Sequence, residues 1–417
     1  MLGVFTTLPA GAWEVSSAYS LGGQYSDNIG LVPDNEEEAW VGLAMARYGI
    51  RERSGNLDLD AMAQLEYRDY QTDLLDDELL FSLDANAVWT LAPGRRFWHF
   101  EDYYRQADSD PLEPPTPENR EDTNVLSTGP EFRWRLSPYR TAIAGARYGY
   151  FWFEEDDVDS QRLSAYARLV HDWRARTQLS VNGEVTTVGY VEEVHSDYNR
   201  GDVYARAEQT LARGVLQVDL GGTHIQRDED DDVSGILGRV ALNLDVNSYS
   251  TLDSALIYQY TDVGHDILTT ASRDGAVGVL DEQVTGDLYY IRHGELAYEW
   301  HGVRASLRVV GVLREEDYED DPADRTVQEV HGHVGYRLSD TLSLALSAIH
   351  VRQDFRENDV DITERHLGGG LHYRINSRLR AALEGGTTEQ DSNDPSIEYR
   401  ENVWLISLTY ERTPFLE

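Results

Sequence analysis

Residues 57–68 read Leu-Asp-Leu-Asp-Ala-Met-Ala-Gln-Leu-Glu-Tyr-Arg, so every odd position is apolar or aromatic and almost every even position is polar. Successive side chains of a β-strand point to opposite faces of the sheet, and a period of two residues therefore predicts a strand. One face of this strand meets an apolar medium and the other face meets water.

The same period recurs along the chain, and no segment shows a comparably sustained helical period. It is found again in residues 79–91, 303–312, 342–349 and 403–410. Short turns, from Ser54-Gly55 to Asn376-Ser377, alternate with longer acidic loops. This alternation of short turns and long loops predicts an all-β fold, a single closed antiparallel up-and-down transmembrane β-barrel of about 20 strands (18–20). The short turns are expected in the periplasm and the long acidic loops outside the cell.

The composition excludes several classes of protein. The 75 acidic and 36 basic residues give a net charge of −39, and every basic residue is arginine. Such a chain does not neutralise phosphates, so nucleic acid is not an expected partner. The chain has no cysteine, which excludes disulfides and thiolate metal sites. No apolar run reaches the roughly 18 residues that a transmembrane helix needs, but a β-barrel escapes that test.

The first twelve residues resemble the end of a secretory signal. Met1 to Ala12 is weakly apolar and ends in Ala10-Gly11-Ala12, an A-x-A-like cleavage pattern, although a cationic segment is missing. An ordinary apolar N-terminus is the alternative. We therefore expect a signal-peptide remnant in residues 1–12 and an outer-membrane barrel in residues 13–417.

Aromatic residues recur a few positions before the short turns, as expected for a girdle at the membrane interface. This group comprises Trp89, Trp134, Trp173, Trp300, Tyr336 and Tyr373. A soluble sandwich has no reason to repeat that placement, so the pattern favours a membrane protein.

The polar face of the strands is expected to line the lumen. Its arginines include Arg47, Arg51, Arg68, Arg105, Arg133, Arg135, Arg147, Arg168, Arg206, Arg239, Arg304, Arg308 and Arg337, and its carboxylates include Asp58, Asp60, Glu66, Asp84, Glu131 and Glu184. Guanidinium groups bind carboxylates and phosphates, so this wall could conduct an acidic or hydroxylated polymer. Alternatively, the charges brace the wall as cross-strand pairs. Residues 107–122 and 264–286 are long enough to constrict the lumen or to cover its mouth.

Signals for catalysis or metal binding are weak. His331 and His333 share a strand face, but no third metal ligand is evident, and a polar lumen pair is the simpler interpretation. Asp228, Asp230 and Asp232 could hold a divalent cation, yet they lack the EF-hand pattern and are better explained as a solvated acidic loop. His171, His224 and His350 are expected on the lipid face, where a hydrolase needs a serine partner that the sequence does not reveal. We therefore expect neither an enzyme nor a cofactor.

One short motif resembles a known family. Residues 19–31, with Tyr25-Ser26-Asp27-Asn28-Ile29 after a Gly-Gly pair, are similar to the first strand and loop of β-barrel porins found with exopolysaccharide and PEP-CTERM loci. That resemblance implies a whole-chain barrel that is the outer-membrane exit for an exopolysaccharide made by an inner-membrane assembly system, without a catalytic motif.

The expected function is therefore passive export of an exopolysaccharide through a barrel in the outer membrane of a Gram-negative bacterium. Expected partners are outer-membrane lipid and lipopolysaccharide, the polysaccharide and a periplasmic export protein. The alternatives are a diffusion porin for small solutes, a lipid-acting barrel enzyme and a calcium-binding adhesion barrel.

Overall fold

The structure is a computed structural model that describes residues 13–154, 158–192, 195–228, 230–266, 287–319, 324–356 and 358–413. The expected signal remnant, residues 1–12, lies outside these ranges. No helix in them is long and apolar enough to span a membrane.

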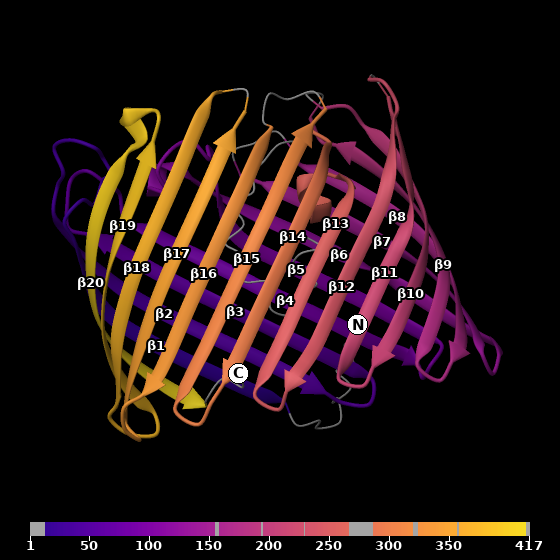
Figure 1. Cartoon of the computed structure of the whole chain (residues 1–417), viewed down its shortest axis with the longest axis horizontal. Helices are drawn as coiled ribbons and strands as arrows, with labels where there is room; N and C mark the ends of the chain where they lie inside the picture. The colour runs from indigo at the N-terminus through magenta and orange to yellow at the C-terminus, as the bar shows by residue number, and fades with distance from the viewer. Residues whose placement is uncertain are drawn as a thin grey trace, which may run out of the picture.

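Twenty β-strands make up most of the described chain (Figure 1). They are β1 (Glu14–Ser26), β2 (Ala39–Arg53), β3 (Leu57–Tyr70), β4 (Glu78–Ala92), β5 (Arg96–Asp108), β6 (Arg120–Ser137), β7 (Arg140–Phe153), β8 (Ser160–Arg174), β9 (Thr177–Tyr190), β10 (Tyr198–Leu211), β11 (Gly214–Arg227), β12 (Val233–Asn247), β13 (Ser250–Thr261), β14 (Tyr289–His301), β15 (Ala305–Tyr318), β16 (Arg325–Arg337), β17 (Leu342–Phe355), β18 (Val360–Arg374), β19 (Leu379–Ser392) and β20 (Tyr399–Thr413). Two short 3-10 helices, η1 (Pro117–Asn119) and η2 (Pro395–Ile397), and a helical turn at 263–266 lie in the connections.

Each strand pairs antiparallel with the next, and β1 pairs with both β2 and β20, so the sheet closes into a 20-stranded barrel. The barrel predicted from the period of two is thus confirmed, with its strand count. Closure gives the backbone of both edge strands a partner, which a strand surrounded by lipid requires.

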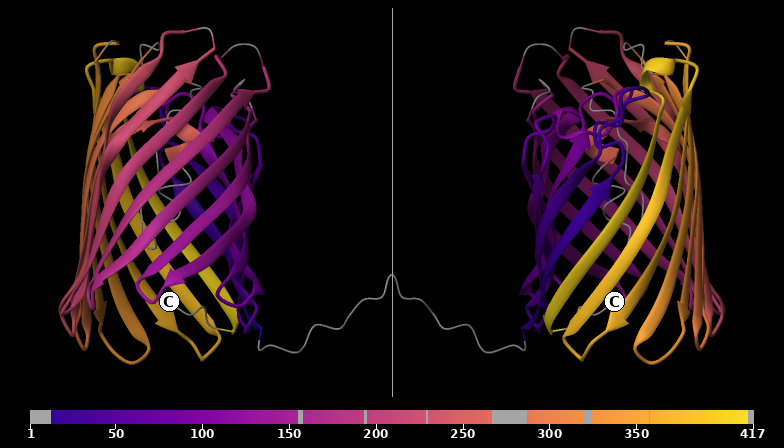
Figure 2. Two further views of the ribbon diagram at one scale, coloured as in Figure 1. Left: turned by 90° about the vertical axis from the view of Figure 1, so that its right-hand side faces the viewer. Right: turned by 90° about the vertical axis from the view of Figure 1, so that its left-hand side faces the viewer.

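The two ends of the barrel differ as expected (Figure 2). Strand β1 begins and β20 ends at the end that carries the short turns, and the longer loops occupy the other end. The turn between β4 and β5 contains Gly94 at φ 67°, a left-handed conformation that favours glycine. Between β14 and β15 the turn is longer than expected, because the Gly302 amide donates to the Ala305 carbonyl. Val303 and Arg304 therefore precede β15.

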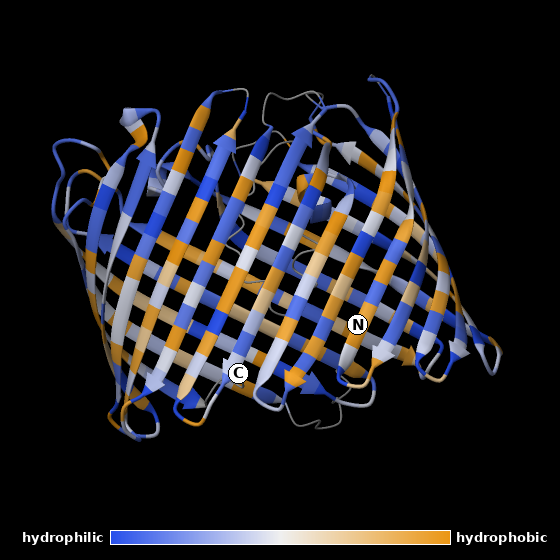
Figure 3. Ribbon diagram, viewed as in Figure 1, coloured by the Kyte–Doolittle hydropathy of each residue, from blue (hydrophilic) through white to orange (hydrophobic). Residues whose placement is uncertain are grey.

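Hydrophobic and hydrophilic residues alternate along the strands (Figure 3), so the two faces of the barrel wall differ in polarity. Large apolar side chains remain exposed on the outside, such as Leu21 (67%), Leu163 (62%) and Leu220 (63%). A continuous exposed apolar surface of this kind indicates a lipid-facing wall. Asp102 interrupts it, and its carboxylate accepts a hydrogen bond from Asn124 at 2.9 Å.

The largest buried apolar cluster lies inside the barrel toward the long-loop end. It joins Val125 and Phe151, from β6 and β7, to Tyr289 and Ile291 of β14, with Val263 of the helical turn between them. Strands that are not neighbours in the sheet are therefore bridged across the lumen at this level.

Candidate functional site: the lumen wall

The strand register determines which predicted residues point inward. Cross-strand partners such as Arg51 and Asp60, or Arg206 and Asp219, share the face opposite the exposed apolar side chains. All six predicted carboxylates and all the predicted arginines except Arg304 occupy inward positions in this register. Arg304 instead lies exposed in the turn before β15.

Many of the inward charges pair with one another across or along the strands. Arg51 bonds Asp60 at 2.9 Å, and Arg206 binds Asp219 through two bonds of 2.7 Å. Further ion pairs of the same kind are Arg68 with Glu66 (2.8 Å) and Glu78 (3.1 Å), Arg133 with Glu131 (2.6 Å), and Arg308 with Glu299 (2.8 Å). These pairs fit the expectation that part of the wall is braced by internal charge pairs.

A second group of inward arginines has no carboxylate partner. Within the described part of the chain, Arg147, Arg168 and Arg239 form no ion pair. Arg147 donates to main-chain carbonyls, the nearest that of Ala146 at 3.0 Å, and Arg239 donates to Gln259 at 2.6 Å. These guanidinium groups therefore keep donors that the wall itself does not satisfy.

Arg200 was missed when the sequence was assigned to faces. Its Nε donates to Asp202 at 2.9 Å, but its Nη1 and Nη2 are buried with no hydrogen-bond partner in the part of the chain that the structure describes. Arg200 alternates with Asp202 and Tyr204 on the inward face of β10. The sequence did contain a signal for it, because Arg200 lies two residues before Asp202 and must therefore share its face. That signal was missed because β10 begins earlier than expected, within residues that had been assigned to the preceding loop.

Arginines also lie against aromatic rings on the inward face. Arg133 lies 4.4 Å from the ring centroid of Phe97, and Arg147 lies 5.3 Å from that of Tyr166. Arg206 and Arg239 lie 5.8 and 5.9 Å from the same ring, that of Tyr204. Strands β5–β12 thus present guanidinium groups and rings together, and each pairing is worth about 0.5–2 kcal/mol.

The helical turn at 263–266 enters the lumen from the end of β13. Side chains in and next to this turn bind residues of β8, β10 and β15. The Asp262 carboxylate accepts from Arg162 of β8 at 2.6 Å and from the Tyr198 hydroxyl of β10 at 2.6 Å. Asp266 bonds Arg314 of β15 at 2.7 Å. We call residues 262–266 the docked turn. The expected constriction falls in part on residues 267–286, outside the described residues, but the docked turn itself narrows the lumen.

Burial and neighbouring charges shift the pKa values of Asp262 and His265 in the docked turn. Burial alone would raise the pKa of Asp262, but the Arg162 guanidinium outweighs it and holds that pKa far below its usual range. Burial, reinforced by the positive charge of Arg200, lowers the pKa of His265 to about 3. At neutral pH the turn is therefore docked with Asp262 ionised and His265 neutral.

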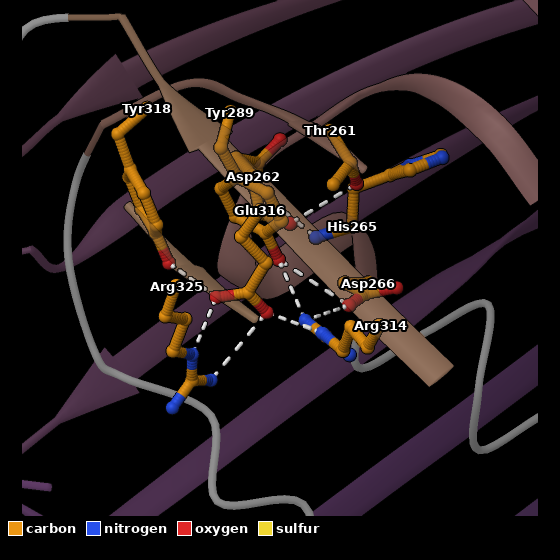
Figure 4. Close-up of polar contacts among 9 residues, drawn as sticks. All are labelled: Thr261, Asp262, His265, Asp266, Tyr289, Arg314, Glu316, Tyr318 and Arg325. Atoms are coloured by element: carbon orange, nitrogen blue, oxygen red, sulfur yellow. Dashed lines mark hydrogen bonds and ion pairs between the residues drawn. The ribbon is translucent and has the colours of Figure 1, made fainter. Parts of the chain in front are cut away.

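A buried charge network continues from the docked turn into the wall (Figure 4). Glu316 of β15 binds Arg314 on its own strand and Arg325 of β16, the latter at 2.6 Å, and accepts from the Tyr318 hydroxyl at 3.1 Å. Glu316 and Arg325 are almost fully buried, with 0% and 1% of their side chains exposed. Two guanidinium groups thus converge on one carboxylate.

The remaining candidates have simpler surroundings. His331 and His333 face the lumen, and His331 lies 3.0 Å from Glu329 on the same strand. Among the described residues, which include Asp228, Asp230 and Asp232, no group of three or more acidic or histidine side chains could hold a metal ion.

The girdle aromatics all occupy outward positions near the short turns, and Trp89, Trp134 and Trp173 are each at least half exposed. Trp300, Tyr336 and Tyr373 share that face in the strand register.

On the lipid face, His224 has a partner that was not evident from the sequence. Its Nδ1 lies 2.8 Å from the hydroxyl of Ser234, directly opposite on β12, and its Nε2 lies 3.9 Å from Asp232. The second distance exceeds a hydrogen bond, so the three side chains do not form a connected triad.

The Asp27-Asn28 motif has a structural role at the closing seam. Asp27 accepts from the backbone and side-chain amides of Asn402 on β20 at 2.7 and 2.8 Å. The Asn28 amide donates to the carbonyls of Val32 and Arg400. These bonds tie the end of β1 to β20.

No protein-family profile matches the chain, and no curated protein matches it in sequence. Among solved structures it resembles the FrpB iron transporter from Neisseria meningitidis, with 11% identity and a TM-score of 0.51 over 95% of this chain and 82% of that chain. The siderophore receptor PirA from Pseudomonas aeruginosa has 12% identity and a TM-score of 0.48 over 99% and 82% of the two chains. Such low identity establishes the fold alone. A closed barrel with an apolar outer wall belongs in the outer membrane of a Gram-negative bacterium.

Proposed function

We propose that this barrel is a conduit for export of an exopolysaccharide across the outer membrane. The observation that carries the proposal is the inward wall of β5–β12, where guanidinium groups lie against Phe97, Tyr166 and Tyr204. An aromatic ring offers an apolar face to a sugar ring, and a guanidinium donates to its hydroxyl and carboxyl oxygens.

The size of the barrel is compatible with a polymer. Twenty strands spaced by about 4.8 Å and tilted by about 40° enclose a circle with a backbone radius of about 20 Å. The docked turn reduces this opening, which is what a conduit that must not leak small solutes requires. Many weak contacts along one wall suit conduction, because a single tight contact would stall the chain.

The decisive experiment is single-channel recording of the purified protein in planar bilayers, with polysaccharide added to one side. Reversible block by polymer, relieved as voltage drives the chain through, supports the conduit. A large conductance that is indifferent to polymer would instead identify a diffusion porin. Deletion of the gene should abolish surface polymer while small-solute uptake is retained, and an unchanged polymer yield would refute the proposal.

A second candidate, a lipid hydrolase, is favoured by the contact between His224 and Ser234 on the lipid face. An acyl-hydrolase assay on phospholipid and lipopolysaccharide in mixed micelles tests it. Hydrolase activity that is lost in Ser234→Ala would support this candidate function. Absence of hydrolase activity in the unmodified protein would refute it.

A further inference from the structure

We propose that Arg147, Arg168, Arg200 and Arg239 form a binding site for one carboxylate of an acidic sugar, here called the anion site. This inference rests on the proposed conduit and narrows its substrate to a polyanionic chain.

The four arginines converge on one region of the wall. In the strand register Arg147 and Arg200 share one row, through Ser164 and Thr186. The Arg239 guanidinium lies 5.9 Å from the ring centroid of Tyr204, two strands away. Arg168 is directly opposite Asn182, which sits two residues before Glu184 on the same face and itself faces Tyr204. The site therefore spans β7 to β12, beside the rings that the conduit proposal uses.

The wall leaves these guanidinium groups short of acceptors. Within the described ranges, the Nε of Arg168 and both Nη atoms of Arg200 are buried without a hydrogen-bond partner. Arg200 is only 5% exposed, so these donors have neither an acceptor among those residues nor bulk water. A buried charged donor left unsatisfied is costly, and an incoming anion would remove that cost.

The net charge of this region also favours an anion. The four arginines carry +4, and Glu184 and Asp202 carry −2. The charges of Arg206 and Asp219 cancel, because these two side chains form an ion pair with two hydrogen bonds. Glu101 of β5 also reaches Arg147, which leaves 4 − 3 = +1. A local positive excess inside a chain with a net charge of −39 selects for an anion.

The site is open on one side and closed on the other. Arg147, Arg168 and Arg239 are half-buried, so they meet the lumen, whereas Arg200 is buried and interacts with His265 of the docked turn. A carboxylate entering from the lumen would meet three guanidinium groups first and reach Arg200 at the back. Planar, forked donors of this kind match a carboxylate better than a hydroxyl.

The test compares channel block by hexagalacturonate, neutral maltohexaose and inorganic sulfate. The variants are Arg168→Gln, Arg239→Gln and their double, with Arg51→Gln as the matched control, because Arg51 is an inward arginine outside the site. Heat-modifiable mobility on gels verifies that each variant folds. Loss of one charge-assisted contact should weaken hexagalacturonate block by about tenfold or more, whereas the control should block normally.

Each outcome decides something. Equal block in all variants, or equal block by maltohexaose, would refute the anion site while leaving the conduit intact. Sulfate as potent as hexagalacturonate would overturn the assignment to an acidic sugar. If the protein does not conduct, the conduit proposal fails. Calorimetric binding of hexagalacturonate that is lost in the double variant would still support the site, and absence of binding would refute it.

Discussion

Replacing Arg162 by Gln should release the docked turn and open the lumen. Arg162 lies 2.6 Å from Asp262, whose side chain is only 3% exposed, so the variant leaves a buried carboxylate without its cation. Breaking a buried ion pair by removing one partner costs about 3–5 kcal/mol. Tyr198 still donates to Asp262, so the lower value is the better estimate. A loss of about 3 kcal/mol shifts the balance between docked and released turn by about 100-fold.

The assay combines conductance with labelling of a single cysteine, which is practical because the natural chain contains none. Val263→Cys places a thiol in the docked turn, where the side chain is now 3% exposed. In the Arg162→Gln background this cysteine should react with a water-soluble thiol reagent about 100-fold faster, since labelling follows the population of the open form. The single-channel conductance should rise in the same variant.

Two further variants separate this effect from general damage. Gly264→Val should release the turn by another route, because a Cβ on Gly264 would clash with the ring of Phe151. The pair Arg206→Gln with Asp219→Asn removes an ion pair within the wall and should leave the labelling rate of Val263→Cys unchanged. If Arg162→Gln labels and conducts like the unmodified protein, the ion pair does not hold the turn and the reasoning is wrong.

Three more predictions follow from the same contacts. Between pH 7.5 and 5 the released His265 gains a proton near its ordinary pKa while the docked one, with a pKa of about 3, does not, so docking should weaken by about 2 kcal/mol at pH 5. The labelling rate of Val263→Cys, divided by that of a fully exposed cysteine to cancel the loss of thiolate, should rise on acidification, and this ratio should be independent of pH in His265→Gln. Glu316→Gln should lower the free energy of unfolding by about 3–5 kcal/mol, because it removes the carboxylate that the buried Arg314 and Arg325 share, and only Arg314 keeps a second ion pair, with Asp266; guanidinium titration followed by tryptophan fluorescence measures this, and a loss below 1 kcal/mol would contradict it. Leu220→Arg, on the lipid face, should cost about 2–4 kcal/mol, whereas Gln217→Arg on the same strand but facing the lumen should refold normally, and equal costs would show that the register is wrong.

The fold was predictable because its signal is local. Each strand carries its own alternation, as in residues 57–68, and most of the short turns carry a Gly, Pro or Asn of their own. The inward positions of Arg51, Asp60 and Glu131 followed from parity alone, that is, from whether a residue occupies an odd or an even position along its strand. Arg304 was misassigned because parity cannot tell where a turn ends, and here the hydrogen bond of Gly302 to Ala305 delays the strand.

The candidate site was predictable only in part. Parity placed Arg147, Arg168 and Arg239 in the lumen, but it could not show that they lack carboxylate partners while Arg206 has one. That difference depends on which strands lie side by side and on the stagger between them. The partner of His224 was missed for the same reason, since Ser234 becomes its neighbour only through the register of β11 and β12.

The sequence by itself determined a closed antiparallel barrel, its lipid and lumen faces and its acidic long loops, because each depends on a repeat of two residues and on turn chemistry within a few positions. Only the tertiary structure decided that Asp262 reaches across to Arg162 and Tyr198, that Glu316 holds two arginines, and that both Nη atoms of Arg200 are buried without an acceptor among the described residues. The contacts of Asp262 join residues up to a hundred positions apart on elements that are not neighbours in the sheet. Their distances are set by the curvature of the whole barrel, which no local pattern encodes.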